Sequence, residues 1–362
     1  MKREFVAYLV MSTVISVSFA STLSFQGLGD LPGGSFSSFA FDVSADGSVV
    51  VGRSSSALGT EAFRWENGEM VGLGNLGGSH SDAQAVSADG SVVVGISNSR
   101  AFRWENGVIS SLGSIPGGSS QNYGRGLSGN GEVAVGYSPN YATGTEAFRW
   151  KSGVMESLGN LGRSYSVAYG VSEDGQIVVG SSESSFGREA FRWENGSMEG
   201  MGDLVGGSFY SSAIDISTNG NVIVGTGHST YGWEAFRWED GVMRGLGDLP
   251  GGSYDSHATS VSADGSIVVG FSNSDIGGEV FIWDEENGIQ SLKNILEDKC
   301  GLDITGWSLF EGYGISDDGL TIVGCGVNPD GFKEGFIATI PEPTTISLLA
   351  LGALSILRKR KQ

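Results

Sequence analysis

One stretch constrains the fold of this chain more than any other feature. Residues 40 to 76 read AFDVSADGSVVVGRSSSALGTEAFRWENGEMVGLGNL. Its first part returns as AVSADGSVVVG from Ala85, GLSGNGEVAVG from Gly126, GVSEDGQIVVG from Gly170, DISTNGNVIVG from Asp215, SVSADGSIVVG from Ser260 and GISDDGLTIVG from Gly314. A repeat that occupies residues 25 to 340 of 362 favours one body of repeated units over two unrelated domains. The 60 glycines sit at fixed places in these copies, which argues against a disordered chain.

Each copy contains two tight-turn signals. The first is an Asp-Gly or Asn-Gly pair at residues 46–47, 89–90, 130–131, 174–175, 219–220, 264–265 and 318–319. The second is a pair ending in Gly at residues 67–68, 106–107, 152–153, 195–196, 240–241 and 287–288. Such pairs between apolar runs favour two-residue hairpins with type I′ turns, because this turn needs positive φ at both central residues. We therefore expect two hairpins, and so four strands, in each copy.

In the first copy the expected strands are Ala40 to Ala45, Ser48 to Arg53, Glu61 to Glu66 and Glu69 to Leu76. The second strand is nearly unbroken Val, which indicates that both of its faces are covered. A helix is expected only around residues 291–299, in the insertion that lengthens the last copy.

The glycines of the first turn are spaced by 43, 41, 44, 45, 45 and 54 residues. A period near 44 with four strands is typical of a β-propeller blade, so we expect an all-β, seven-bladed propeller. The last copy stops at Ile340 without a fourth strand, whereas Phe25 to Leu31 (FQGLGDL) matches a fourth strand with nothing before it. The N-terminal strand is therefore predicted to complete the last blade, which also removes exposed sheet edges.

This topology assigns the connections to two faces. The tight turns share one face. The other face carries connections between copies at Pro32 to Ser35, Gly77 to Ser79, Pro116 to Ser119, Gly206 to Ser208 and Pro250 to Ser253. It also carries loops that vary between copies, at Ser54 to Thr60, Ser97 to Arg100, Ser138 to Thr145, Ser181 to Arg188 and Gly227 to Trp233. Variable loops on a rigid scaffold are where recognition usually occurs, so we expect ligand contacts on this face.

Both ends of the chain read as targeting segments. Residues 1–20 have a basic start, an apolar stretch and a small-x-small site with cleavage expected after Ala20, as in a signal peptide. Residues 341–362 contain Pro341, Glu342 and Pro343, then an apolar run from Ile346 to Leu357, then Arg358, Lys359, Arg360 and Lys361. Twelve apolar residues are short for a stable bilayer crossing, which needs about 20. The expected organisation is thus a signal peptide (1–20), the propeller (21–340) and a tail (341–362).

The tail resembles the PEP-CTERM sorting signal of Gram-negative bacteria, in which a Pro-Glu-Pro motif precedes a short hydrophobic segment and a basic end. This resemblance implies processing by an exosortase system in the membrane, transient membrane anchoring, and delivery to the cell surface or extracellular matrix of a bacterium that makes exopolysaccharide. A plain transmembrane anchor is the alternative. Either interpretation places the repeats outside the inner membrane.

The repeats resemble the HAF repeat of bacterial extracellular proteins. The similarity lies in Glu-Ala-Phe-Arg-Trp at residues 61–65, 146–150, 189–193 and 234–238, followed by a Leu-Gly-x-Leu-x-Gly-Gly-Ser type of connection. The chain departs from the family in having Glu or Arg where the family name has His, and in reading Val-Phe-Ile-Trp at residues 280–283. The family has no settled activity, so the resemblance implies location and architecture rather than chemistry.

Charge and cysteines narrow the partners further. The chain has a net charge of -20, and since residues 1–20 carry +1 and the tail +3, the repeats carry -24. Nucleic acid is therefore not an expected partner, because phosphate binding needs clustered Lys and Arg. Cys300 and Cys325 are the two cysteines. Export makes a disulfide between them possible, and two lone thiols are the alternative.

Few side chains suggest a reaction. A ring of arginines next to Trp (Arg64, Arg103, Arg149, Arg192 and Arg237) suggests either glycan binding or, as we expect, stacking and pairing with acids between blades. His80, His228 and His257 lie in three separate segments, with His80 and His257 expected at one equivalent position. We expect no catalytic, metal or cofactor site. The predicted function is non-catalytic binding of exopolysaccharide or surface proteins; the alternative is a polysaccharide lyase or glycosidase using carboxylates near the central channel.

Overall fold

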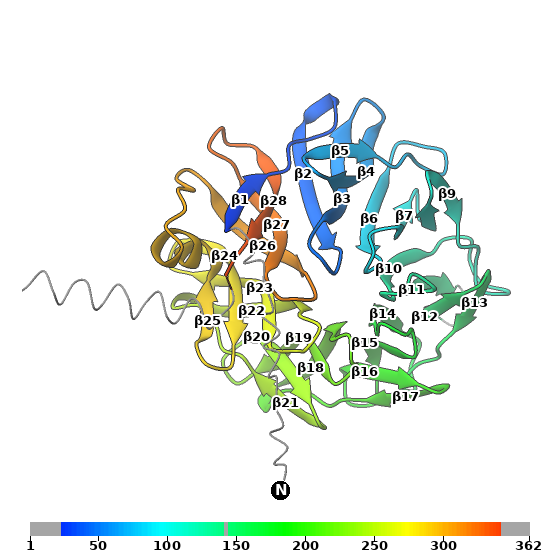
Figure 1. Ribbon diagram of the computed structural model, residues 1–362. Coiled ribbons are helices and arrows are strands. Elements are labelled where there is room, and N and C mark those ends of the chain that lie inside the picture. Colours follow the sequence, from blue (N-terminus) through cyan, green and yellow to red (C-terminus); the bar gives the residue numbers. More distant parts are fainter. Residues whose placement is uncertain (1–22, 141–143, 342–362) are drawn as a thin grey trace, which may run out of the picture.

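The computed structural model describes residues 23–140 and 144–341, and these fold almost entirely into β-strands (Figure 1). The expected signal peptide and the tail beyond Pro341 lie outside the described residues. Four of the five hydrogen-bonded sheets have four strands each, and the fifth has 12. Figure 1 shows the sheets following one another around a common centre. The fold is thus all-β, with four-stranded sheets in a ring.

The first three sheets are each continuous in sequence. They contain β2 (Gly33–Val43), β3 (Val49–Ser56), β4 (Gly59–Glu66) and β5 (Glu69–Gly72); β6 (Ser81–Val86), β7 (Val92–Ser97), β8 (Arg100–Glu105) and β9 (Val108–Ser111); β10 (Tyr123–Leu127), β11 (Val133–Asn140), β12 (Gly144–Lys151) and β13 (Val154–Ser157).

The 12-stranded sheet is three four-stranded units joined by two single parallel bridges, Arg188 to Tyr210 and Trp233 to Asp255. The units contain β14 (Ser166–Val171), β15 (Ile177–Glu183), β16 (Arg188–Glu194) and β17 (Ser197–Gly200); β18 (Gly206–Ile216), β19 (Val222–Ser229), β20 (Trp233–Glu239) and β21 (Val242–Gly245); β22 (Gly251–Val261), β23 (Ile267–Ser274), β24 (Gly277–Asp284) and β25 (Gly288–Ser291). The last sheet contains β26 (Ser308–Ile315), β27 (Thr321–Val327), β28 (Lys333–Thr339) and β1 (Ser24–Gly27).

The core lies between neighbouring sheets. The Phe of each third strand has no exposed surface: Phe63, Phe102, Phe148, Phe191, Phe236, Phe281 and Phe336. Val51 and Leu73 of the first sheet form one buried cluster with Val93 and Phe102 of the second. The second strand of each sheet is therefore covered on both faces, as its apolar run predicts.

The two ends of the chain meet in the last sheet. β1 pairs antiparallel with β28, with Phe25 opposite Ala338, and Figure 1 shows the two strands side by side. Glu334 accepts a hydrogen bond from the Gly29 amide at 2.8 Å, as Glu61 does from the Gly74 amide at 3.2 Å in the first sheet. The predicted pairing of the N-terminal strand is confirmed, although β1 is shorter than the stretch we expected.

The ring also closes at its inner wall. The first strand of each sheet contacts the first strand of the next, and β26 contacts β2. The Asp317 amide donates to the Ala45 carbonyl at 3.1 Å, and the Ala45 amide donates to the Ala88 carbonyl at 3.0 Å. Val323 and Ile337 of the last sheet share a buried cluster with residues of the first. The first strands therefore form the inner wall, which the chain ends do not interrupt.

The two classes of turn differ. At the second turn both residues have positive φ, as in Asn67 (53°) and Gly68 (84°), so the type I′ prediction is confirmed for all of these pairs except residues 287–288, where only the glycine has positive φ. At the first turn the type I′ prediction is wrong. Only the glycine has positive φ, and the Gly47 amide donates to the Ser44 carbonyl at 2.9 Å. The Asp46 carboxylate accepts from the Ser44 hydroxyl and the Ser48 amide, which favours an Asx-type turn.

We call the edge of the ring with these turn pairs the turn rim and the opposite edge the loop rim. The loop rim consists of the connections between second and third strands (residues 57–58, 98–99, 184–187, 230–232, 275–276 and 328–332) and between sheets (28–32, 73–80, 112–122, 158–165, 201–205, 246–250 and 292–307).

Several segments predicted as loops on this rim are strands. Gly33 pairs with Ser56, Gly206 with Ser229 and Gly251 with Ser274, so the Gly-Gly-Ser segments at these places extend β2, β18 and β22. The variable loops shorten accordingly: only residues 57–58 connect β3 to β4. The prediction failed because backbone pairing continues through polar Ser and Gly residues that read as loop by composition.

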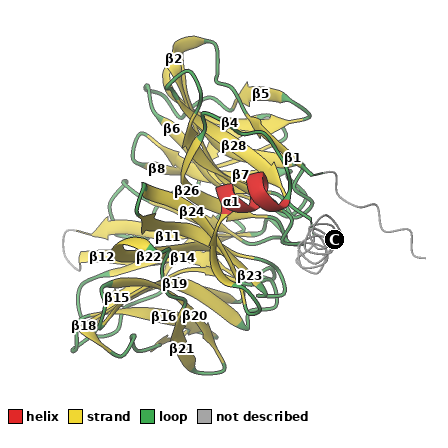
Figure 2. Cartoon of the chain, turned by 90° about the vertical axis from the view of Figure 1, so that its left-hand side faces the viewer, coloured by secondary structure: helices red, strands yellow, loops and turns green. Residues whose placement is uncertain are grey.

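The expected helical insertion is present as α1 (Leu292–Asn294) and a π-helical turn (Ile295–Lys299), which lie on the outside of the ring in Figure 1 and face the viewer in Figure 2. Ser291 caps it by accepting a hydrogen bond from the Asn294 amide at 3.4 Å. Leu292 and Leu296 pack into the core next to the last sheet. Across the described residues, no helix has the length and hydropathy required to cross a membrane.

The disulfide that export made possible is not formed. Cys300 and Cys325 are both free. Cys325 is buried on β27, where its thiol donates to the Ser38 carbonyl of the neighbouring sheet at 3.8 Å. Cys300 ends the π-helical turn and packs with the cluster that contains Trp307. The two thiols thus face different neighbours.

Candidate binding surface of the inner wall and loop rim

The inner strand of each sheet contains an extra residue at one shared position. The register of this strand against the second shifts by one residue at the same place in every sheet, which is a β-bulge. The extra residues are Phe41, Gln84, Arg125, Tyr169, Ile214, Thr259 and Tyr313. No other position of the repeat combines a fixed backbone irregularity with such varied side chains. Bulges re-aim side chains and are common beside binding sites.

These bulge residues contact one another around the ring. The Arg125 guanidinium donates to Gln84 Oε1 at 2.9 Å. The rings of Phe41 and Tyr313 meet edge to face with centroids 5.2 Å apart, across the junction of the first and last sheets. The Thr259 hydroxyl donates to the Gly312 carbonyl at 2.8 Å. The inner wall is thus a surface of mixed chemistry held by a uniform backbone.

A row of aromatic side chains in contact with one another continues from this wall towards the loop rim. We call it the aromatic belt, and it comprises the rings of Tyr165, Tyr210, Trp233, His228, His257 and Phe271 and the guanidinium of Arg188. Arg188 lies over the ring of Tyr165 at 4.3 Å and over that of Tyr210 at 5.6 Å. Tyr210 meets Trp233 edge to face at 4.7 Å. These contacts join the sheets that begin with β14 and β18.

The belt extends into the sheet that begins with β22. Trp233 stacks over His257 at 6.4 Å, and His257 stacks on Phe271 at 4.7 Å. His257 Nε2 lies 2.8 Å from Asp255 Oδ1, and its Nδ1 lies 3.1 Å from the Thr226 hydroxyl. Both ring nitrogens therefore have partners, which fixes the orientation of this imidazole.

The hairpin tips of the loop rim expose apolar side chains. Leu58, Phe186, Tyr231, Ile276 and Phe332 each lie in a connection between second and third strands, and between 48% and 76% of each is exposed. Behind two of these tips, Phe186 contacts Phe209 and Tyr231 contacts Tyr254. Large apolar groups exposed at equivalent places indicate an interaction surface.

Two carboxylates of the inner strands have structural partners. Asp42 accepts hydrogen bonds from the Val43 amide at 2.9 Å and from the Val86 amide of the next sheet at 2.8 Å. Asp215 does the same with Ile216 and Val261. Burial raises the pKa of Asp42 to about 7 and also raises the pKa of Asp215. Both oxygens of each carboxylate hold backbone amides, so these groups join sheets rather than face a substrate.

The histidines do not occupy one equivalent position, and that prediction was wrong. The strand register makes Asp82, opposite Ile96, the equivalent of His257, opposite Phe271. His80 lies two residues earlier, at the place of Asp255. His80 Nε2 lies 3.1 Å from Asp82 Oδ2, so these two sheets contain the same His–Asp pair in reversed order. His228 lies in the aromatic belt, against Trp233.

The five arginines next to Trp pair locally but not as expected. Arg64, Arg103, Arg192 and Arg237 each bond a glutamate two residues later on the same strand, and Arg149 bonds Glu156 on the adjacent strand. Their contact with the next sheet is to a backbone carbonyl instead: Arg64 Nε donates to Gly90 at 3.1 Å, and Arg237 Nε to Gly265 at 3.1 Å. The pairing with acids is therefore within a sheet, and these arginines also support the turn rim.

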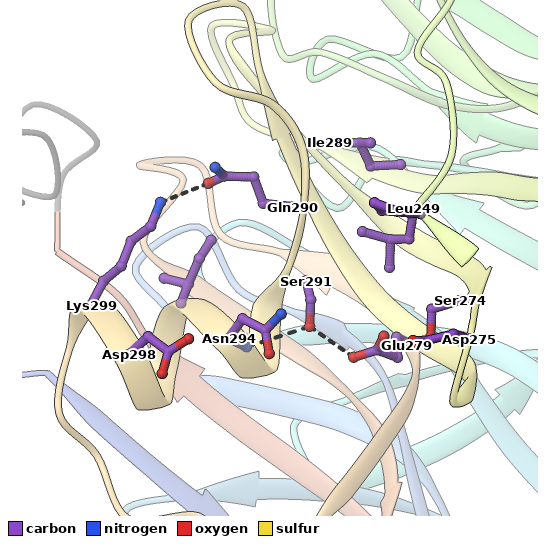
Figure 3. Close-up of a pocket in the computed structure, with 12 residues that line it drawn as sticks. Leu249, Ser274, Asp275, Glu279, Ile289, Gln290, Ser291, Asn294, Asp298 and Lys299 are labelled. Carbon is purple, nitrogen blue, oxygen red and sulfur yellow. Dashed lines mark hydrogen bonds between the residues drawn. The ribbon is translucent and has the colours of Figure 1, made fainter. Parts of the chain in front are cut away.

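Two surface hollows lie away from the belt. One of about 430 Å³ lies beside the helical insertion, where Lys299 bonds Gln290 and Ser291 bonds Glu279 (Figure 3). Another of about 740 Å³ lies on the turn rim around Trp283. Within residues 23–140 and 144–341, no group of three or more His, Cys, Asp or Glu side chains could hold a metal ion.

Comparison with solved structures shows low similarity. The chain is similar to the putative TolB from Agrobacterium tumefaciens, with 16% sequence identity over 75% of this chain and 94% of that chain and a TM-score of 0.48. It is also similar to TolB from Acinetobacter baumannii, with 13% identity over 70% of this chain and 61% of that chain and a TM-score of 0.46. No curated protein matches the sequence.

The C-terminal end gives a direct match. Residues 339–361 match the family model of the PEP-CTERM protein-sorting motif. They include the predicted Pro341, Glu342 and Pro343 and the basic end from Arg358 to Lys361, of which only Pro341 is among the described residues. Such a motif implies processing by exosortase-type machinery. The chain is therefore an exported bacterial protein with a PEP-CTERM sorting tail.

Proposed function

We propose that this protein is a surface-sorted, seven-bladed β-propeller that binds polysaccharide at its loop rim without cleaving it. The aromatic belt is the observation that carries the proposal. Aromatic rings with a polar edge offer flat apolar area to a sugar ring and hydrogen bonds to its hydroxyls. In the belt, the Arg188 guanidinium lies over both Tyr165 and Tyr210 of neighbouring sheets, and Tyr210 contacts Trp233, so the row spans a length that suits a ligand of several linked sugars.

The position of the tail supports this direction of binding. The Ile340 amide donates to the Leu320 carbonyl at 2.8 Å, beside the Asp318–Gly319 turn, so the described chain ends at the turn rim. A tail held at the membrane would then leave the loop rim pointing outwards. We infer that the aromatic belt faces the extracellular matrix of a Gram-negative cell. Assignment of the copies to the HAF type stays a prediction from their Glu-Ala-Phe-Arg-Trp motif.

The hydrogen bonding of the inner carboxylates favours binding over cleavage. A glycosidase needs a pair of carboxylates that face the scissile bond. Asp42 and Asp215 instead accept backbone amides with both oxygens. We therefore place the lyase or glycosidase alternative second.

Incubation of the purified protein with extracted cell-surface polysaccharide tests the proposal. We expect the protein to be retained on immobilised polysaccharide, with no new reducing ends and no absorbance from unsaturated sugars after prolonged incubation. Release of such ends would establish the enzymatic alternative. Absence of retention together with absence of cleavage would overturn both.

A further inference from the structure

Two arginines of the binding surface lack a counter-charge. The protein has a net charge of -20, and most described arginines form an ion pair with a carboxylate. Among residues 23–140 and 144–341, those without such a pair are Arg100, Arg125, Arg163, Arg188 and Arg244. Arg100, Arg163 and Arg244 are exposed to solvent, whereas Arg125 and Arg188 are partly buried. Among the arginines that the structure describes, only these two are partly withdrawn from water without a carboxylate partner.

Arg188 is held by aromatic rings. Its guanidinium lies over Tyr165 at 4.3 Å and donates to the Tyr210 hydroxyl at 3.4 Å. Glu183 is opposite Arg188 in the strand register, yet the two side chains form no ion pair. The guanidinium therefore has one weak hydrogen bond for its five N–H groups. It is positioned by stacking, and most of its donors remain available.

Arg125, on the inner wall, also lacks a carboxylate partner. It donates to the neutral Gln84 amide oxygen at 2.9 Å and lies over Tyr137 at 5.8 Å. Its Nε is buried and has no partner. Burial raises the pKa of Tyr169 to about 12, whereas the positive charges of Arg125 and Arg188 both act to lower it.

We propose that Arg125 and Arg188 bind carboxylate groups of an acidic polysaccharide, so that the ligand of the loop rim contains uronate sugars. This inference rests on the proposed function and names the chemical class of its ligand. A partly desolvated cation without a counter-charge costs free energy, and an anion from outside would offset this cost. The planar guanidinium fork matches a carboxylate with two parallel hydrogen bonds. The neighbouring tyrosine rings provide the surface for the sugar.

Calorimetric titration of the purified full chain with polymers of matched backbone tests the inference. The probes are polygalacturonate and alginate, the methyl ester of each, dextran, and dextran sulfate. We expect binding of the two uronates that weakens with added salt, and at least about tenfold weaker binding of the esters, since each carboxylate loses charge-assisted hydrogen bonds.

Two substitutions locate the site. Arg188→Gln and Arg125→Gln should each weaken uronate binding about tenfold and reduce its salt dependence. Arg244→Gln removes an exposed, unpaired arginine on the turn rim and should leave binding unchanged. Arg188→Lys retains the charge without the fork, so it should bind with intermediate affinity even if Arg188→Gln is unstable. Near-ultraviolet circular dichroism checks that each variant is folded.

The outcomes separate the inference from the proposed function. Equal binding of the uronates and their esters, or of dextran, would overturn the inference and leave polysaccharide binding intact. Equal binding of dextran sulfate would overturn the choice of carboxylate. Binding to none of the polymers would overturn the inference, and the same result with extracted cell-surface polysaccharide would overturn the proposed function as well.

Discussion

The turn rim and the loop rim are formed at opposite ends of the same strands. The repeated sequence and its hydrogen bonds recur on the turn rim, whereas the loop rim differs from copy to copy. On the turn rim the Ser44 hydroxyl donates to Asp46 and accepts from the Val49 amide, and these two bonds recur in every sheet at Ser87, Ser128, Ser172, Ser217, Ser262 and Ser316. On the loop rim the described hairpin tips differ in length and sequence. The repeated residues specify the scaffold, and departures from the repeat specify the binding surface.

We expect stability and ligand binding to depend on different residues. Substitutions on the turn rim and at the closure should lower the free energy of unfolding and leave ligand binding unchanged in the folded protein. Substitutions in the aromatic belt should weaken ligand binding and change the free energy of unfolding little.

Removal of the strand that closes the ring should have the largest effect. Phe25 stacks on Phe336 at 5.7 Å and meets Trp307 edge to face at 5.1 Å. Phe25→Ala should lower the free energy of unfolding by about 3 kcal/mol, and deletion of residues 24–31 by more. Chemical denaturation measures both. Gln26→Ala, at the exposed neighbouring position, is the control, and equal midpoints for Phe25→Ala and the control would contradict the closure.

Two carboxylates near the turn rim, Asp42 at the end of an inner strand and Asp89 in a turn, should respond to pH with opposite signs. Hydrogen bonds from Ser87 and Ser91 lower the pKa of Asp89 on the turn rim to about 2, whereas burial raises that of Asp42 to about 7. The stabilisation from Asp89 is present above about pH 4 and is lost as the pH falls towards 2, because its folded pKa lies below the unfolded value. The contribution of Asp42 declines as the pH rises from about 4 to 7, because its folded pKa lies above it.

Thermal unfolding between pH 2 and pH 9 tests both signs. We expect the midpoint temperature to be highest near about pH 4 to 5, between the two limbs. Asp42→Asn should flatten the decline from pH 4 to 7 and leave the acid limb unchanged. If Asp42→Asn and the unmodified protein lose the same midpoint temperature between pH 4 and 7, Asp42 does not cause this decline.

Loss of one turn hydroxyl should have a moderate effect. The Ser172 hydroxyl accepts from the Ile177 amide at 3.0 Å and donates to Asp174 at 2.8 Å. Ser172→Ala should lower the free energy of unfolding by about 1 to 2 kcal/mol, since it leaves a partly buried amide without a partner. Ser185→Ala on the loop rim is the matched control and should leave the free energy of unfolding unchanged. Weaker polysaccharide binding by folded Ser172→Ala would contradict the expectation that turn-rim residues act on stability alone.

Trp233→Ala should have the smallest effect on stability and a large effect on binding. The side chain is 36% exposed, so we expect a loss of less than about 1 kcal/mol in the free energy of unfolding. Binding to polysaccharide should weaken at least about tenfold, as for a central aromatic anchor. Val108→Ala, which removes an exposed side chain of β9, is the control. Unchanged binding by Trp233→Ala would remove the belt from the site.

Sequence patterns with short range predicted much of the scaffold. Asn67-Gly68 predicted a type I′ turn because the requirement for positive φ is local. The pairing of β1 with β28 followed from a missing strand at one end and a surplus strand at the other. Both arguments depend on neighbours within a few residues or on the count of repeats.

The binding surface could not be predicted in the same way. Arg188 stacks between Tyr165 and Tyr210, which belong to different copies, and this contact depends on how neighbouring sheets pack. The bulge that sets Arg125 and Tyr169 on the inner wall leaves no mark in composition. One signal was present: this position varies between copies, whereas the residue directly before it is always Ala or Gly. The strand register is likewise not visible in the sequence, which led to the wrong alignment of His80 with His257.

Amide hydrogen exchange of the protein with and without cell-surface polysaccharide shows which rim binds the ligand. We expect polysaccharide to protect residues 184–188, 206–212 and 228–233, which surround the aromatic belt, and to leave the turn rim unchanged. Protection confined to the Asp-Gly turns, or no protection under conditions where the polysaccharide is bound, would contradict this expectation.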